Sequence, residues 1–164
     1  MSALNDAIAH SLVTSQRLLN RFCEDLKPEE YLHRPCSGGN ATAWILGHII
    51  MTDRSALKRA GMSELPPLPE GFEQRFSREE QAPKATEFGD VTVLLPLFNR
   101  HRDLLIEAVQ EMSPAALEKP LDKPHPLYGS RTWEAIHFAS GVHTATHVGQ
   151  ITIIRRSMGK PPIV

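Results

Sequence analysis

Three histidines on two predicted helices have the residue types and spacing of a metal site. His143 and His147 form an H-x-x-x-H pair, and His48 lies in a second apolar stretch, Trp44–Ile49. Residues four apart lie on one face of a helix, so two imidazoles at this spacing can hold one divalent ion. A third imidazole from a neighbouring helix would give three protein ligands and one open position, as in catalytic zinc sites.

Both predicted helices place these histidines on their apolar faces. At about 100° per residue, His147 lies roughly 40° from His143 and Gln150 roughly 20° to its other side. His48 shares its face with Trp44. A single buried histidine is more simply explained by a hydrogen bond within the core. Three histidines on facing apolar stripes instead indicate a bound metal ion. Each buried polar ring needs a polar partner, and one ion can be the partner of all three.

His101 lies on the inner side of a third predicted helix, within about 60° of Phe98 and Leu105. His101 is therefore a candidate for a fourth metal ligand, for a residue that hydrogen-bonds to a ligand, or for a substrate contact. The simpler alternative is a histidine at the edge of the bundle with no role in the site. A fourth protein ligand would close the site and make it structural. His101 and Gln150 are the candidates for catalytic or orienting roles, and the catalytic residues are otherwise unassigned.

Other catalytic motifs find little support in the sequence. Zinc metalloproteases carry Glu directly after the first His of the pair, and Thr144 occupies that position here. The nearest carboxylate, Asp53, lies about 140° from His48 by the helical step. Proton transfer would then depend on an ion that lowers the pKa of water to near 7, on His101, or on a loop residue. Gly-x-Ser-x-Gly and glycine-rich phosphate loops are absent.

Helical periodicity marks four segments, at about 4–22, 42–59, 91–112 and 131–158. Asn40 or Thr42 is the expected cap of the second, and Ser130 or Thr132 that of the fourth; Gly61 and Gly159 are expected stops. No convincing strand pair is evident. The pattern predicts an all-α protein, an antiparallel or mixed four-helix bundle forming a single domain over 1–164. The long 61–90 connection can carry the chain across the bundle, so that the second and third helices run parallel.

The composition is that of an ordinary soluble protein. The 164 residues are 41% hydrophobic and 23% charged, with a net charge of −1. No long basic run is present, which disfavours nucleic-acid binding. Cys23 and Cys36 are expected to be reduced thiols. No signal peptide and no membrane-spanning stretch is evident, so we expect a cytoplasmic protein.

The histidine motifs are similar to those of a known family. The chain resembles the DinB/YfiT-like superfamily of metal-dependent enzymes in its Trp44–Ile49 segment, in His143–Ile151, which contains His-x-x-x-His-x-Gly-Gln, and in its closing Arg155–Pro162. The resemblance covers nearly the whole chain in helix order and length. One departure is Ala139, where many relatives carry a further histidine; the 61–90 connection matches no particular subfamily.

This resemblance implies an up-down-down-up four-helix bundle, usually dimeric. It also implies a divalent metal, commonly nickel or zinc, held by His48, His143 and His147. Related families include bacillithiol transferases and mycothiol-dependent maleylpyruvate isomerases. We therefore expect a metal-dependent enzyme acting on a small-molecule substrate, with S-transfer from a low-molecular-weight thiol as the first hypothesis. Hydrolysis by metal-bound water and a non-catalytic metal- or ligand-binding bundle are the alternatives.

Overall fold

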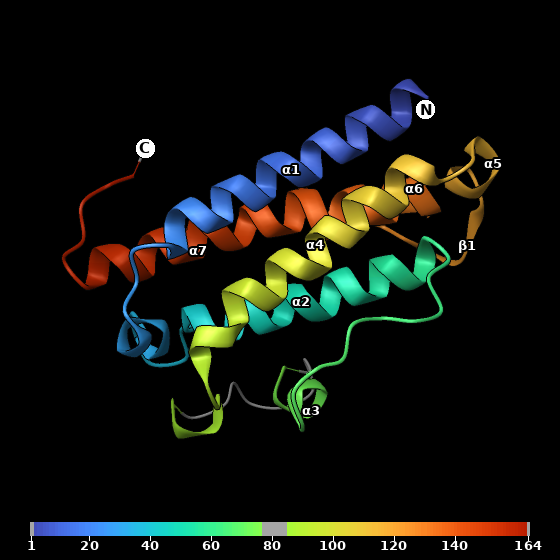
Figure 1. Cartoon of the computed structure of the whole chain (residues 1–164). Coiled ribbons are helices and arrows are strands. Elements are labelled where there is room, and N and C mark those ends of the chain that lie inside the picture. Colours follow the sequence, from blue (N-terminus) through green and yellow to red (C-terminus); the bar gives the residue numbers. More distant parts are fainter. Residues whose placement is uncertain (1, 77–84, 164) are drawn as a thin grey trace.

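Four long helices make up most of the computed structural model, which describes residues 2–76 and 85–163. They are α1 (Ala3–Cys23), α2 (Thr42–Arg59), α4 (Leu94–Glu111) and a composite last helix. The last helix joins α6 (Thr132–Ile136), the π-helical segment η4 (His137–Val142) and α7 (His143–Ser157). In Figure 1, α2 and α4 run in one direction and α1 and α7 in the other. The predicted all-α bundle with up-down-down-up topology is confirmed.

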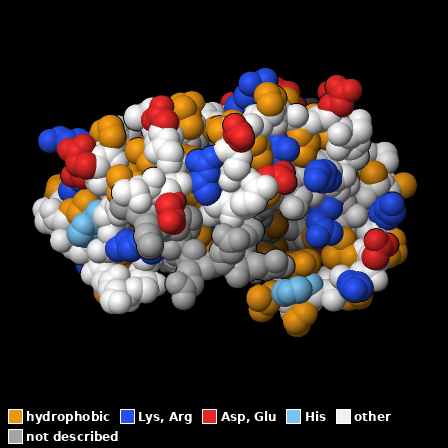
Figure 2. Space-filling model, turned by 90° about the horizontal axis from the view of Figure 1, so that it is seen from below, with side chains coloured by type: hydrophobic (Ala, Val, Ile, Leu, Met, Phe, Trp, Pro, Cys, Tyr) orange, Lys and Arg blue, Asp and Glu red, His pale blue; other side chains and the backbone are white. Residues whose placement is uncertain are grey.

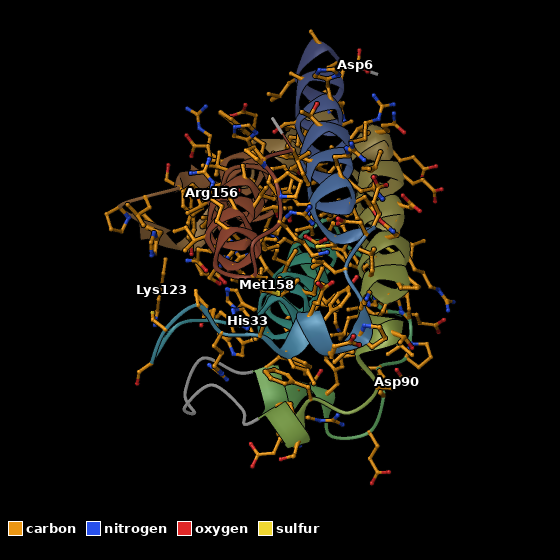
Figure 3. All side chains as sticks on the ribbon, turned by 90° about the vertical axis from the view of Figure 1, so that its left-hand side faces the viewer. Asp6, His33, Asp90, Lys123, Arg156 and Met158 are labelled. Atoms are coloured by element: carbon orange, nitrogen blue, oxygen red, sulfur yellow. The ribbon has the colours of Figure 1, made fainter. Side chains whose placement is uncertain are left out.

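The helices form a closed ring around the core. α1 packs against α4 and the last helix, and α2 packs against the same two. Figure 3 shows the ring nearly end-on, with His33 and Met158 at the end facing the viewer. The two parallel helices, α2 and α4, are direct neighbours. The chain between them therefore has to return along the length of the bundle, as the long 61–90 connection predicted.

The helix stops are as predicted, but the starts differ. Gly61 and Gly159 have φ values of 99° and 77°, the left-handed conformation that ends helices. The cap residue of α2 is Ala41, which has no side chain that could cap it. The cap residue of the fourth helix is Arg131, whose backbone N–H donates to the Glu134 carboxylate at 2.8 Å; the N–H of residue 130 donates to the same carboxylate at 2.7 Å. Neither predicted pair of caps is therefore correct.

The third helix begins slightly later than its periodicity indicated. A 3-10 turn, η3 (Val91–Val93), precedes α4, and the Asp90 side chain caps this turn by accepting from the Thr92 N–H at 2.9 Å. Pro96 therefore lies in the first turn of α4, where its missing N–H disturbs no helical hydrogen bond.

A small hairpin, absent from the sequence prediction, precedes the last helix. After α5 (Pro114–Leu117), β1 (Pro120–His125) pairs antiparallel with β2 (Gly129–Arg131). Pro120 pairs with Arg131, and His125 pairs with Gly129. Both strands lack an alternating apolar face, β1 contains two prolines and β2 is only three residues long, so they lack the pattern that identifies strands in a sequence. Tyr128, in the turn, packs on Phe138 with ring centroids 5.6 Å apart.

The connections at one side of the bundle carry short helices. They are η1 (Pro28–Leu32), α3 (Phe72–Phe76) and η2 (Ala85–Glu87). α3 packs on α2, where the Phe76 ring lies so close to Gly47 that a Cβ there would be 2.2 Å from it. Gly47 therefore makes room for α3 beside the next residue, His48.

A polar layer divides the apolar core in two. Arg102 of α4 is fully buried and makes a bidentate pair with Asp53 of α2, with N···O distances of 2.9 and 3.0 Å. It also donates to Ser15 of α1 at 2.7 Å and to Thr144 of α7 at 3.0 Å. These four residues, here called the Arg102 layer, come one from each long helix. One apolar cluster lies on each side of the layer.

The surface is mixed in charge. On the face nearest α3, acidic and basic side chains are interspersed with apolar ones (Figure 2). Among the described residues, no helix is long and apolar enough to cross a membrane. Cys23 and Cys36 are both free thiols; the first is buried and the second is exposed.

Candidate metal centre

The three predicted histidines meet at one point between α2 and α7. Nε2 of His143 lies 3.3 Å from Nε2 of His48 and 3.0 Å from Nε2 of His147. The three rings stand at 73–84° to one another, so their nitrogens converge while their rings diverge. His48 and His147 are each 6% exposed, and His143 is half-buried.

This geometry fits a divalent ion. With N–Zn distances of about 2.0–2.1 Å, two ligands of a tetrahedral zinc are roughly 3.3 Å apart, close to the spacing seen here. All three ligand atoms lie within 4.8 Å of one another. Across 2–76 and 85–163, no second group of three or more His, Cys, Asp or Glu side chains is this close. The donor set is three imidazoles, which suits zinc, nickel, copper or iron better than magnesium or calcium.

Gln150 fixes the orientation of one ring. Its Oε1 lies 3.1 Å from Nδ1 of His147 and also accepts from the side-chain amide of Asn40 at 3.2 Å. An oxygen facing Nδ1 requires that nitrogen to carry the proton, which leaves the Nε2 lone pair directed at the centre. Gln150, a candidate for an orienting role, thus contacts one ring of the histidine group. Asn40, which the sequence suggested as a helix cap, instead holds Gln150 in place.

Trp44 packs against another ring. Its indole stacks on the His48 imidazole at 4.9 Å between centroids and 7° between planes, and it meets His147 edge-on at 6.4 Å. The i, i+4 spacing of Trp44 and His48 places both rings on one helix face, which is the signal in the sequence for this contact. The stack restricts the His48 ring and covers one side of the centre with an apolar surface.

His101 is occupied elsewhere and is fully buried. Its Nδ1 lies 2.8 Å from the carbonyl of Leu97, and its Nε2 lies 3.1 Å from an Nη1 of Arg54. Arginine only donates, so Nε2 is the acceptor and Nδ1–H donates to Leu97, which makes the ring neutral. Burial is the largest cause that lowers the pKa of His101 below 6.5, and the nearby Arg54 adds to it. Both nitrogens are used, so His101 does not complete the three-histidine group.

The π-helical segment leads directly into the first histidine of the pair. Single π turns inside α-helices often mark functional sites. Here, Ser15 of α1 donates to the carbonyl of Ser140 at 3.1 Å, and Thr144 donates to the same carbonyl at 2.9 Å. Thr144 in turn accepts from Arg102. The Arg102 layer therefore fixes the residue next to His143, a connection that the sequence did not reveal.

A cavity of about 510 Å³ opens beside the three rings. His48 and His143 line it, together with residues of α2, α3, the hairpin turn and the π-helical segment. Its apolar walls include Met51, Phe76 and Phe138. Ala139, the residue at which this sequence departs from the family that it resembles, also lines the cavity. A methyl group there leaves space next to His143 that a larger ring would fill.

Comparison with known proteins identifies the family and agrees with this fold. The model of the DinB superfamily matches residues 11–151. The chain belongs to the DinB superfamily. This DinB-superfamily chain also matches the solved structure of YfiT from Bacillus subtilis, described as a probable metal-dependent hydrolase with an unusual four-helix bundle topology. The TM-score is 0.67 at 14% identity, over 98% of this chain and 91% of the other. At this identity the likeness concerns the fold. Among curated proteins, no significant match was found.

Proposed function

We propose that this DinB-superfamily protein is a divalent-metal-dependent enzyme whose ion is held by His48, His143 and His147. The convergence of the three Nε2 atoms, 3.0 and 3.3 Å apart, carries the proposal. Nickel and zinc are the expected ions, because both accept neutral imidazole ligands. With three protein ligands the site keeps a position for substrate, and His48 and His143 border the cavity from which substrate would enter.

The reaction proposed first is transfer of a low-molecular-weight thiol to an electrophilic small molecule. A bound divalent ion supplies Lewis acidity, which lowers the pKa of a ligated thiol or water into the neutral range. Within the described part of the chain, the only carboxylate lining the cavity is Glu73, and no carboxylate belongs to the histidine group. Thiolate substitution suits such a site: the new S–C bond replaces the bond to a leaving group such as a halide, which departs as an anion without an acid to protonate it, and the thiol proton is released to solvent.

The chain's own residues would bind and orient the reactants. Gln150 holds the His147 ring in the tautomer with Nδ1 protonated, and Trp44 holds the His48 ring by stacking. Phe76, Phe138 and Met51 would exclude water from the apolar part of the substrate. His101, with both nitrogens engaged, supports the bundle and is not proposed to transfer protons.

Hydrolysis is the second candidate. It is favoured by the likeness of fold to a protein described as a probable metal-dependent hydrolase. The two reactions are separated by one comparison: turnover of a soluble electrophile such as 1-chloro-2,4-dinitrobenzene with and without added thiol, beside turnover of 4-nitrophenyl acetate without thiol. Thiol-dependent turnover that requires the ion supports transfer. Turnover of the ester alone supports hydrolysis, and activity that survives loss of the ion contradicts both.

We also propose a homodimer that uses the outer face of the last helix, from Val142 at the end of η4 to Ile153 in α7. Val142 and Ile153 are 44% and 60% exposed, and the exposed positions between them include Ala145 and Gly149. A solvent-facing helix normally carries charges on its outer face, whereas this one carries none between residues 143 and 154. Light scattering should report a dimer for the parent and a monomer for Ile153→Lys. A monomeric parent would exclude the dimer without affecting the metal proposal.

A further inference from the structure

The cavity beside the histidine group is a groove along α2. His48, Thr52, Ser55 and Arg59 all line it. Positions 48 and 59 are eleven residues apart, a rise of about 16 Å along the helix axis at 1.5 Å per residue. The volume of about 510 Å³ is within the range of small-molecule sites. A ligand that reaches from the imidazoles toward Arg59 must therefore be elongated.

The middle of the groove offers few polar partners. Met51, Phe76 and Phe138 supply apolar surface on different elements. The hydroxyls of Thr52 and Ser55 donate to backbone carbonyls one turn earlier in α2, at 3.0 and 3.2 Å. These hydroxyl protons are therefore not available to a ligand. The part of a ligand that lies here is best matched by a hydrocarbon or aromatic segment.

The groove is also lined by one positive and one negative side chain, Arg59 and Glu73. Among the residues that the structure describes, neither makes a hydrogen bond or an ion pair, with the other or with a third group. Arg59 lies in the last turn of α2 and Glu73 in the first turn of α3, where the helix dipole favours a positive and a negative charge, respectively. This preference explains the sign of each charge, but not why both side chains line the same groove. Two opposite charges left apart in one groove are complementary to a ligand that carries both signs.

We propose that the groove binds elongated small molecules with a zwitterionic end, an apolar middle and a reacting group beside the histidines. An α-amino acid with a long side chain belongs to this class: its carboxylate would pair with Arg59 and its ammonium group with Glu73. Arginine is suited to bidentate carboxylate binding, and glutamate accepts from ammonium. This substrate class rests on the proposed reaction at the three histidines, but binding of the zwitterionic end does not require the ion.

Three matched probes test the proposal with the purified 164-residue protein. L-Homophenylalanine carries both charges, 4-phenylbutyrate lacks the amine, and 3-phenylpropylamine lacks the carboxylate. Isothermal titration calorimetry should show roughly tenfold tighter binding of L-homophenylalanine than of either other probe, since each of those probes lacks one charge-assisted contact and solvent screening limits what such a contact contributes at exposed side chains. Arg59→Gln should remove the advantage over 3-phenylpropylamine. Glu73→Gln should remove the advantage over 4-phenylbutyrate.

Other patterns would overturn the proposal. Equal binding of the three probes, no binding at millimolar concentration, or a preference that both variants leave unchanged would show that the two charges are not a recognition pair. Tightest binding of 4-phenylbutyrate or 3-phenylpropylamine would show a site for a single charge. None of the three probes has a bond that a hydrolase could cleave or an electrophilic carbon that a thiol could attack. Their binding is therefore measured without turnover. A protein that prefers L-homophenylalanine but holds no metal would contradict the proposed function alone.

Discussion

Gln150 and His147 form a hydrogen bond in which Oε1 of the amide lies 3.1 Å from Nδ1 of the ring. Such contacts behind a metal ligand set its tautomer, and their loss typically costs 10- to 100-fold in metal affinity. We predict that Gln150→Ala weakens metal binding by roughly 10- to 100-fold, whereas Gln150→Glu retains an acceptor and binds more nearly like the parent. Competition with a chromophoric chelator measures both. Unchanged affinity in Gln150→Ala would show that the contact has no effect on the centre.

The Arg102 layer should be a major determinant of stability. Removing one partner of a buried ion pair leaves an uncompensated charge and costs about 3–5 kcal/mol. We predict this loss for Arg102→Met in urea unfolding, and partial recovery when Asp53→Leu is added. The exposed pair Arg21–Glu24 provides the control: Arg21→Ala should change the free energy of unfolding by less than about 1 kcal/mol. A similar small effect at Arg102 would contradict the importance of the layer.

Two glycines in helices should respond in opposite ways to the same substitution. A Cβ at Gly47 would lie 2.2 Å from the Phe76 ring, whereas a Cβ at Gly149 would have no atom within 4 Å. Gly47→Ala should destabilise the protein by about 1–3 kcal/mol, since α3 must move away. In the Ile153→Lys background, in which the proposed dimer contact on this face is broken, Gly149→Ala should stabilise the protein by up to about 1 kcal/mol, because alanine favours the helix. Thermal unfolding of both variants tests this, and equal effects would be evidence against close packing of α3 on α2.

Acid should weaken the fold through His101. Its pKa in the folded protein is below the 6.5 of an exposed histidine, mainly because it is buried. Between the two values the unfolded chain binds more protons, so the free energy of unfolding falls as the pH is lowered through that window. Unfolding curves between pH 8 and 5 should show a shallower fall for His101→Gln than for the parent. Equal slopes would show that protonation of His101 does not contribute.

Sequence reasoning predicted what depends on local pattern. The 3.6-residue period identified the four long helices, and the i, i+4 spacing placed His143 and His147 together on the core face. The partner from another helix, His48, was found because it too lay on an apolar stripe. The parallel course of α2 and α4 followed from the length of the connection between them.

What escaped prediction depends on contacts between distant parts of the chain. Asp53 was excluded from the site by its angle, but nothing local indicated that it pairs with Arg102, 49 residues away. His101 was on the inner side as expected, yet its partner Arg54 was not foreseen. The hairpin lacks the alternation that marks strands, and the π turn at 137–142 follows from no known sequence signal. The role of Asn40 required knowing where Gln150 would lie.

Metal content of the purified protein tests the central claim most directly. The parent, His147→Ala and the control His101→Gln would be measured by plasma mass spectrometry after gel filtration, with circular dichroism to confirm folding. Three imidazoles around one ion predict close to one nickel or zinc per chain in the parent and in His101→Gln, and loss of the ion in a folded His147→Ala. A parent that holds no ion and cannot be loaded, or a His147→Ala variant that retains it, would contradict the metal centre.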